Sequence, residues 1–203
     1  MELDDFVQTD RGLMVRGASP ELLDELLVQY GAQQRAAGFD PDERLRPGLS
    51  RAEILDPWAE RGVVVPEEIV RLWQWPNGGV GDGQFPGAAI DSIEQSLGRW
   101  DQELKGVVDF LWDPDWITVC SHGVIAVKST EEPPLVRGRD GVRKVEEDDV
   151  WDPRFQLVSI CTLIAMSIYG DEHGLFERNA VGLPDTRREL WPTKLEITKL
   201  HGW

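Results

Sequence analysis

Two residues that could do chemistry stand close together in the middle of the chain, Cys120 and His122. They lie within DWITVCSHGVIAVKST, where β-branched residues on both sides of Ser-His-Gly indicate two strands joined in a hairpin. Side chains two positions apart in a strand share one face, so the pair is a candidate thiol–imidazole site for nucleophilic catalysis. No third orienting group is evident, and a buried cysteine beside a turn histidine explains the pair more simply.

Other groups that could hold a metal or a cofactor are sparse. Cys161 and His173 are far from the first pair in the sequence, and the closely spaced ligand pairs of common metal sites are absent. The glycine-rich stretch NGGVGDGQFPG is not followed by the Lys-Ser/Thr that a phosphate-binding loop needs. The sequence YGDEHG is typical of a helix end closed by Gly170. We therefore expect no metal and no cofactor.

Charge is the strongest compositional feature of the chain. Its 37 acidic and 21 basic residues give a formal net charge of -16. Such a surface disfavours nucleic acid and anionic membranes, because both are bound through lysine and arginine. It favours a basic protein partner, unless the charge serves solubility alone. The run Glu146, Glu147, Asp148 and Asp149 is an acidic loop and a candidate contact for such a partner.

The length of 203 residues fits one large domain. The acidic start MELDDFVQTDRG contains no secretory signal, and the most apolar segment, FQLVSICTLIAMSIYG, is too short to span a bilayer. Two distant cysteines do not make a disulfide framework, so we expect a cytoplasmic protein. The nine tryptophans indicate core packing; among them Trp75 is the candidate for an exposed anchor in a partner interface.

Helix signals dominate the first half of the chain. Ser19 is a cap for a helix that runs through LLDELLVQY and closes at Gly38. Ser50 and Glu53 form a capping-box pair that opens a second helix, which Pro57 shortens or kinks. The stretch DSIEQSLGRWDQEL predicts a further helix by its apolar spacing.

A short helix is also predicted within VVVPEEIVRLWQWPNGG. Pro66 fits the first turn of a helix, where its missing N–H costs nothing. Ile69, Leu72 and Trp73 share one apolar face, and Pro76 ends the helix. The residues Asn77, Gly78 and Gly79 tolerate positive φ. They predict a sharp turn that leads from this helix toward the sheet.

The second half changes to strand patterns and returns to a helix at the end. After the hairpin around Ser-His-Gly, PPLVRGRDGVRKVEEDD places an Asp-Gly turn between short strand-like pieces. The segment RFQLVSICTLIAMSIYG, residues 154–170, predicts a buried helix. Helices, then strands, then a helix indicate an α+β fold with a largely antiparallel sheet.

These motifs together resemble the SMI1/KNR4 family of the SUKH superfamily. The stretch WAERGVVVPEEIVRLWQWPNGG is similar to the family pattern of a hydrophobic-Pro pair, a short helix and Asn-Gly. The matching positions are Trp58, Val65, Pro66, Glu67, Leu72, Asn77, Gly78 and Gly79, with Trp73 on the same helix. Trp116 stands where the family begins a strand pair, and residues 159–169 stand where it has its closing helix. The similarity spans residues 51–170 and leaves extensions at both ends of a single domain.

The resemblance implies N-terminal helices, a central sheet, a closing helix and no catalytic residues. Bacterial members are largely immunity proteins that bind and neutralise a toxin, often a nuclease, and fungal members are regulatory. Three alternatives follow: a cytoplasmic immunity protein with a basic toxin as partner, a regulatory scaffold, or a hydrolase using Cys120 and His122. The acidic balance fits the first, because nucleases are commonly basic.

Overall fold

The structure is a computed structural model that describes residues 1–79, 90–103, 115–120, 125–137, 142–145, 148–151, 156–178 and 184–186. Its helices are α1 (Pro20–Ala36), α2 (Pro41–Arg44), α3 (Arg51–Ala59), α4 (Glu67–Gln74), α5 (Ile93–Glu103) and α6 (Ile160–Glu172), preceded by a 3-10 turn at Leu3–Asp5. The strands β1 to β6 are Phe6–Thr9, Gly12–Val15, Leu45–Pro47, Pro76–Gly79, Trp116–Cys120 and Ile125–Lys128. The strands β7 to β12 are Leu135–Arg137, Val142–Val145, Asp148–Trp151, Gln156–Val158, Phe176–Arg178 and Pro184–Thr186.

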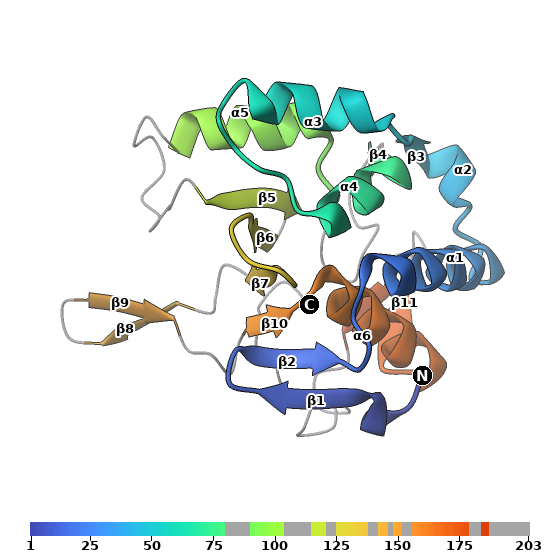
Figure 1. Ribbon diagram of the computed structural model, residues 1–203. Coiled ribbons are helices and arrows are strands. Elements are labelled where there is room, and N and C mark those ends of the chain that lie inside the picture. The colour runs from blue at the N-terminus through green and yellow to red at the C-terminus, as the bar shows by residue number, and fades with distance from the viewer. Residues whose placement is uncertain are drawn as a thin grey trace.

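The fold is α+β, as the order of sequence patterns predicts (Figure 1). Six strands form one sheet in the order β1-β2-β10-β7-β6-β5. Neighbouring strands pair antiparallel except β2 and β10, which pair in parallel. The prediction of a largely antiparallel sheet is therefore confirmed. Three two-stranded pairs, β3 with β4, β8 with β9 and β11 with β12, complete the described strands.

The chain begins with strands rather than with a helix. The β1–β2 hairpin forms one edge of the six-stranded sheet, and Phe6 and Leu13 are fully buried. The sequence patterns described above predict no strand for these residues. The segment before Arg51, which lies outside the family resemblance, thus supplies a hairpin and α1 to the same core as the later elements.

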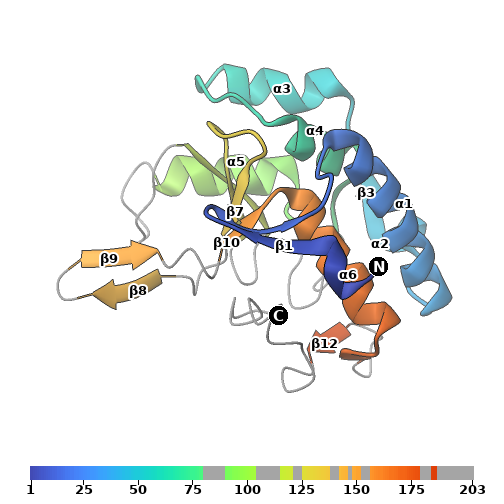
Figure 2. The same cartoon turned by 60° about the horizontal axis from the view of Figure 1, so that its bottom comes forward.

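Helix α6 lies at the centre of the core (Figures 1 and 2). Its residues from Ile160 to Gly170 are all buried, and it packs against α1, α4 and the strands β2 and β10. Helix α5 packs on the edge strand β5, and α3 packs on α4. Among the helices that the structure describes, none combines the length and the apolar character needed to cross a bilayer.

Local helix signals are confirmed at two starts. The Ser19 hydroxyl accepts a hydrogen bond from the amide of Leu22 at the start of α1. Ser50 and Glu53 form the predicted reciprocal capping box at the start of α3, which is nine residues long and contains Pro57. Both signals depend on neighbours within three residues, so the sequence alone is sufficient to reveal them.

The prediction for Pro66 needs a small correction. Pro66 has an extended backbone with ψ of 145° and precedes the helix, which begins at Glu67. The apolar face is confirmed, because Ile69, Leu72 and Trp73 are fully buried. The helix ends at Gln74, before Pro76, as the proline predicts.

The prediction of a turn at Asn77–Gly79 is partly wrong. These residues form strand β4, which pairs antiparallel with β3. The expected positive φ is present at Gly78, at 73°. Pairing with β3, a segment about thirty residues earlier, holds the chain extended on either side of that glycine.

The start of the closing helix is also corrected. The predicted helix includes Gln156–Val158, but these residues form strand β10 between β2 and β7. Ser159 follows with φ of 77° and breaks the chain direction before α6 begins. Apolar residues fill both β10 and α6, so hydrophobic periodicity could not separate a buried strand from a buried helix.

Strands are found where the patterns of the second half predict them. Strands β5 and β6 form the predicted hairpin, and β5 begins at Trp116. Its turn, residues 121–124, lies outside the described residues. Strands β7 and β8 flank Asp140 and Gly141, which also lie outside them, and they join different sheets. In both views the β8–β9 pair lies apart from the six-stranded sheet (Figures 1 and 2).

Candidate functional site

The thiol of the candidate Cys120–His122 pair is buried. Cys120 ends strand β5 and has no solvent exposure. Burial, with the nearby carboxylate of Asp91, raises the pKa of the Cys120 thiol well above its usual range. A thiol in that state is a poor nucleophile, because the thiolate is the reactive form. His122 lies outside the described residues.

The other cysteine and histidine are held apart by α6. Cys161 stands in its first turn and donates a hydrogen bond to the carbonyl of Ser19 at 3.1 Å. His173 follows the last turn, where its ring stacks on Tyr169 at 4.0 Å between centroids. The helix between them is 13 residues long, which separates its ends by about 20 Å. Within the described residues no group of three or more His, Cys, Asp or Glu side chains could hold a metal ion.

Trp58 of α3 and Trp73 of α4, two of the residues named in the family resemblance, belong to the part of the core that contacts α5. Trp58 stacks on Trp73 with an angle of 13° between ring planes and meets Trp100 edge-on at 6.1 Å. All three indoles are buried, and the Trp73 Nε1–H donates to the carbonyl of Asp91 at 3.0 Å. These tryptophans therefore hold α3, α4 and α5 together, which is a structural role.

Asn77 and Gly78, two residues of β4, contact the start of α5. The Asn77 side-chain carbonyl accepts a hydrogen bond from the amide of Ile93 at 2.9 Å and so caps that helix. At Gly78 an added Cβ would lie 2.6 Å from the amide nitrogen of Ser92. Only glycine allows the chain to pass this close at a positive φ. Gly79 follows, and its amide donates to the carbonyl of Ile90.

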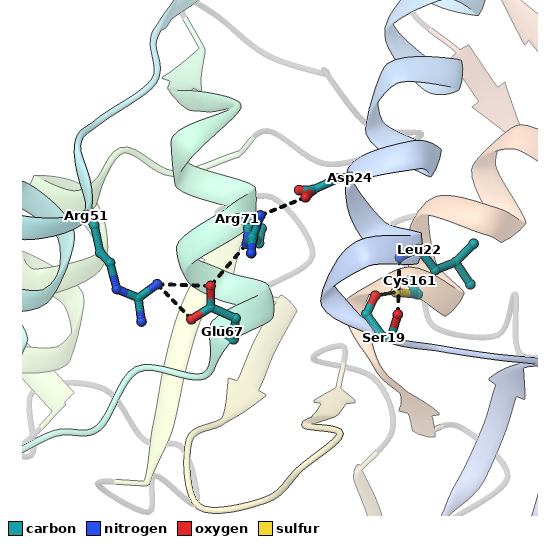
Figure 3. Close-up of polar contacts among 7 residues, drawn as sticks. All are labelled: Ser19, Leu22, Asp24, Arg51, Glu67, Arg71 and Cys161. Carbon is teal, nitrogen blue, oxygen red and sulfur yellow. Dashed lines mark hydrogen bonds and ion pairs between the residues drawn. The ribbon is translucent and has the colours of Figure 1, made fainter.

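Glu67 lies at the centre of a chain of ion pairs across three helices (Figure 3). Its carboxylate accepts two hydrogen bonds from Arg51 of α3 and one from Arg71, one turn later in α4. Arg71 also pairs with Asp24 of α1 at 2.7 Å. All four side chains are partly exposed, so the network orients the helices more than it stabilises them.

The neighbouring acid, Glu68, has a different environment that sequence analysis did not foresee. It is 1% exposed, and its carboxylate accepts hydrogen bonds from the Ser159 hydroxyl and the Ile160 amide. Burial raises the pKa of Glu68 to about 7, against the opposing effect of these hydrogen bonds. The sequence did contain one indication that Glu68 is buried: it stands four residues before Leu72, on the apolar side of the helix.

The candidate contact residues for a partner are placed only in part. Trp75 is half-buried and packs edge-on against Tyr30 of α1, with 6.2 Å between ring centroids. It offers less surface than the exposed anchor that sequence analysis expected. Asp148 and Asp149 belong to strand β9, while Glu146 and Glu147 lie outside the described residues.

A pocket of about 340 Å³ opens beside the link between α3 and α4. That link supplies Arg61, Val63 and Val64, α5 supplies Trp100, and Asp115, just before β5, also lines the pocket. Val64 is 75% exposed, one of the most exposed large apolar side chains among the described residues. The guanidinium of Arg61 forms two hydrogen bonds to Asp101, at 3.0 and 2.9 Å.

Basic side chains in the described residues are mostly paired with acids of the same chain. The paired residues are Arg11, Arg35, Arg46, Arg51, Arg61, Arg71, Arg99 and Lys128. Several exposed acids form no ion pair within the part of the chain that the structure describes, namely Asp10, Glu21, Glu25, Glu43, Glu53, Asp56 and Glu60. Among the described residues, these acids are distributed over α1, α2, α3, the residue that follows α3 and the turn between β1 and β2.

No family model matches the chain, and no curated protein matches it.

Proposed function

We propose that this chain is a non-catalytic binding protein that engages a basic protein partner. In the form that the SMI1/KNR4 resemblance suggests, it is an immunity protein, and the partner is a cognate toxin, such as a nuclease, that it neutralises in the cytoplasm. A regulatory scaffold of the same family type would use the same surface for a different partner.

The distribution of charge carries this proposal. The net charge is -16. Within the described part of the chain most bases form internal ion pairs, whereas the exposed acids Glu53, Asp56 and Glu60 form none there. A basic surface that approaches such a protein meets uncompensated negative charge and is attracted over a distance of several ångströms. The same charge repels nucleic acid and anionic membranes.

The interior supports a binding role over the hydrolase alternative. The Cys120 thiol is fully buried with a raised pKa, so it lacks both the access and the ionisation that a nucleophile needs. Ser159 contacts the buried acid Glu68, but its side chain is also fully buried and caps α6. Both groups are accounted for by packing and helix capping.

The test uses the product of the gene immediately upstream as the probe. We expect it to inhibit growth when expressed alone, to be neutralised when this chain is co-expressed, and to co-purify with it. A complex without rescue of growth would favour the scaffold. Absence of any complex with that product would count against the immunity role.

Stopped-flow mixing of the two proteins tests the charge argument. The association rate should fall about tenfold or more between low and physiological salt, with little change in the dissociation rate. Replacing Glu53 and Asp56 with lysine, or Glu146 and Glu147 with lysine, should slow association at low salt. An association rate that is indifferent to salt would mean that the acids serve solubility alone.

A further inference from the structure

Strand β1 forms one edge of the six-stranded sheet and pairs with β2 on its inner side (Figure 1). Two hydrogen bonds reveal which backbone groups of the hairpin face each other. The amide of Arg16 donates to the carbonyl of Asp5 at 2.8 Å. The amide of Val15 donates instead to the Thr162 hydroxyl of α6 at 2.9 Å. Val15 stands opposite Phe6, so these two residues form a pair without mutual backbone hydrogen bonds.

The alternation along the hairpin identifies the outward groups of β1. In an antiparallel pair, residues that exchange both backbone hydrogen bonds alternate with residues that exchange none. Val7 and Thr9 therefore bond to β2, whereas the amide and carbonyl of Gln8 and the carbonyl of Phe6 point away from it. The Phe6 amide donates to the carbonyl of Leu3. Within the described residues the amide and carbonyl of Gln8 form no hydrogen bond, and Gln8 is exposed.

Three backbone groups spaced along one edge match the chemistry of an extended peptide. The amide and carbonyl of Gln8 can form a reciprocal pair with one residue of an antiparallel strand, and the carbonyl of Phe6 can accept from an amide two residues further along that strand. Charge selects the kind of peptide. The chain has a net charge of -16, and the exposed acid Asp10 directly follows β1. A basic segment is attracted to this edge, whereas a second acidic copy of the chain is repelled.

We propose that an extended, basic segment of the partner adds to β1 as an antiparallel strand. Its backbone hydrogen bonds to Gln8 and Phe6 supply affinity and alignment, and its lysine or arginine side chains approach Asp10 and supply specificity. The inference rests on the proposed function for the source of the segment, but the chemistry of the edge is testable without that partner.

The first experiment measures hydrogen exchange of backbone amides by NMR, with acetyl-Lys-Val-Lys-Val-Lys-Val-amide as the probe. In the free protein the Gln8 amide should exchange faster than the Val7 amide, which bonds to β2. Saturating peptide should slow exchange at Gln8 about tenfold, with a Kd of roughly 1–10 mM. The same peptide with glutamate in place of lysine should give no protection. A Gln8 amide that is protected in the free protein, or protected equally by both peptides, overturns the proposal.

The second experiment measures binding of the upstream gene product to two variants of Gln8. Gln8→Pro removes the outward amide, which the pairing with β2 does not use, so the fold should survive. Gln8→Thr changes the side chain and keeps that amide. The Kd should rise about tenfold for Gln8→Pro and change less than about twofold for Gln8→Thr. Equal affinities of the two folded variants would overturn the proposal.

Exchange at Gln8 in the wild-type complex decides the matter even if Gln8→Pro does not fold. Protection of the Gln8 amide on binding supports the added strand, and an unchanged exchange rate overturns it. Sedimentation of the free chain tests the other occupant of the edge. A concentration-dependent dimer with a protected Gln8 amide would assign the edge to a second copy and overturn its assignment to the partner.

The results separate this inference from the proposed function. If the lysine peptide protects Gln8 but the upstream product forms no complex, the proposed immunity role fails and the assignment of the edge stands. If the product binds and is neutralised while the Gln8 amide stays unprotected, the assignment of the edge fails and the immunity role stands.

Discussion

The carboxylate of Glu68 in α4 accepts the hydroxyl hydrogen of Ser159, 91 residues later in the chain, at 2.7 Å. It also accepts the amide hydrogen of Ile160 at 2.6 Å, so an acid from one helix satisfies the first turn of another. The Ser159 hydroxyl in turn accepts from the amide of Cys161 at 2.9 Å. Ser159 has φ of 77° and ψ of 140°, a sparsely populated conformation that costs on the order of 1–3 kcal/mol in a residue with a side chain. The hydrogen bonds of the Ser159 hydroxyl to Glu68 and Cys161 stabilise Ser159 in this conformation.

Glu68 makes stability depend on pH near neutrality. Its pKa is about 7 in the folded protein, against an ordinary value of 4.5. Between these values the folded chain holds a proton that the unfolded chain has released. The stabilisation is therefore fully present below pH 4.5 and is lost as the pH rises toward 7. The free energy of unfolding should fall by about 3 kcal/mol over this range from Glu68 alone.

Urea unfolding of the wild type and Glu68→Gln at several pH values measures this effect. The difference between the two curves isolates Glu68, because all other acids titrate equally in both proteins. Glu68→Gln should lack this component of the slope. Glu68→Ala leaves the Ser159 hydroxyl and the Ile160 amide without their acceptor and should lose about 2–4 kcal/mol at pH 5. Parallel curves for wild type and Glu68→Gln would contradict the prediction.

Gly78 cannot be replaced without a large loss of stability. A Cβ there would lie 2.6 Å from the Ser92 nitrogen and 2.9 Å from its Cα, and φ is 73°. Gly78→Ala should lower the free energy of unfolding by about 2–4 kcal/mol, and Gly78→Val by at least as much. The measurement is denaturant unfolding.

Gly17 provides the control for this substitution. It has the same φ of 73°, and nothing lies within 4 Å of its added Cβ. Gly17→Ala should therefore lower the free energy of unfolding only by the cost of a positive φ in a residue with a Cβ, about 1 kcal/mol. Equal losses at the two positions would show that the close approach of Ser92 to Gly78 is unimportant.

Asn77 should be replaceable only by a residue that keeps its acceptor. Its side-chain oxygen binds the buried amide of Ile93, and Asn77 is 7% exposed. Asn77→Ala should cost about 1–2 kcal/mol in thermal or denaturant unfolding. Asn77→Asp keeps the oxygen at the helix start and should cost less than Asn77→Ala near neutral pH. The reverse order would mean that the cap contributes little.

Cys120 should be inert toward thiol reagents in the native protein. Burial raises its pKa well above the usual range, and Cys161, with a pKa raised to about 11, is buried as well. A disulfide reagent such as dithionitrobenzoate should label neither thiol until denaturant is added. Cys120→Ala should bind the partner within a few-fold of wild type and lose about 1–2 kcal/mol of stability. Rapid native labelling at Cys120 would reopen the hydrolase alternative.

The sequence by itself determined the features that depend on near neighbours. The cap at Ser19, the capping box of Ser50 with Glu53, the buried face of Ile69, Leu72 and Trp73 and the strand that begins at Trp116 were all predictable. Each is set by residues within about one helical turn or one strand, where propensity and capping act directly. The α+β class and the acidic balance follow from the same local information and from composition.

Only the tertiary structure decided which buried segment is a strand and which is a helix. It also decided which acidic side chains are buried and which are exposed. β10 exists because β2 and β7 lie on either side of it, and no local pattern records that pairing. Glu67 and Glu68 are adjacent in sequence, yet one lies in a partly exposed ion-pair network and the other is buried against α6. The pocket, too, is formed where Val64, Trp100 and Asp115 come together from separate elements. Contacts between distant residues fix burial, and burial sets the cost of holding a charge.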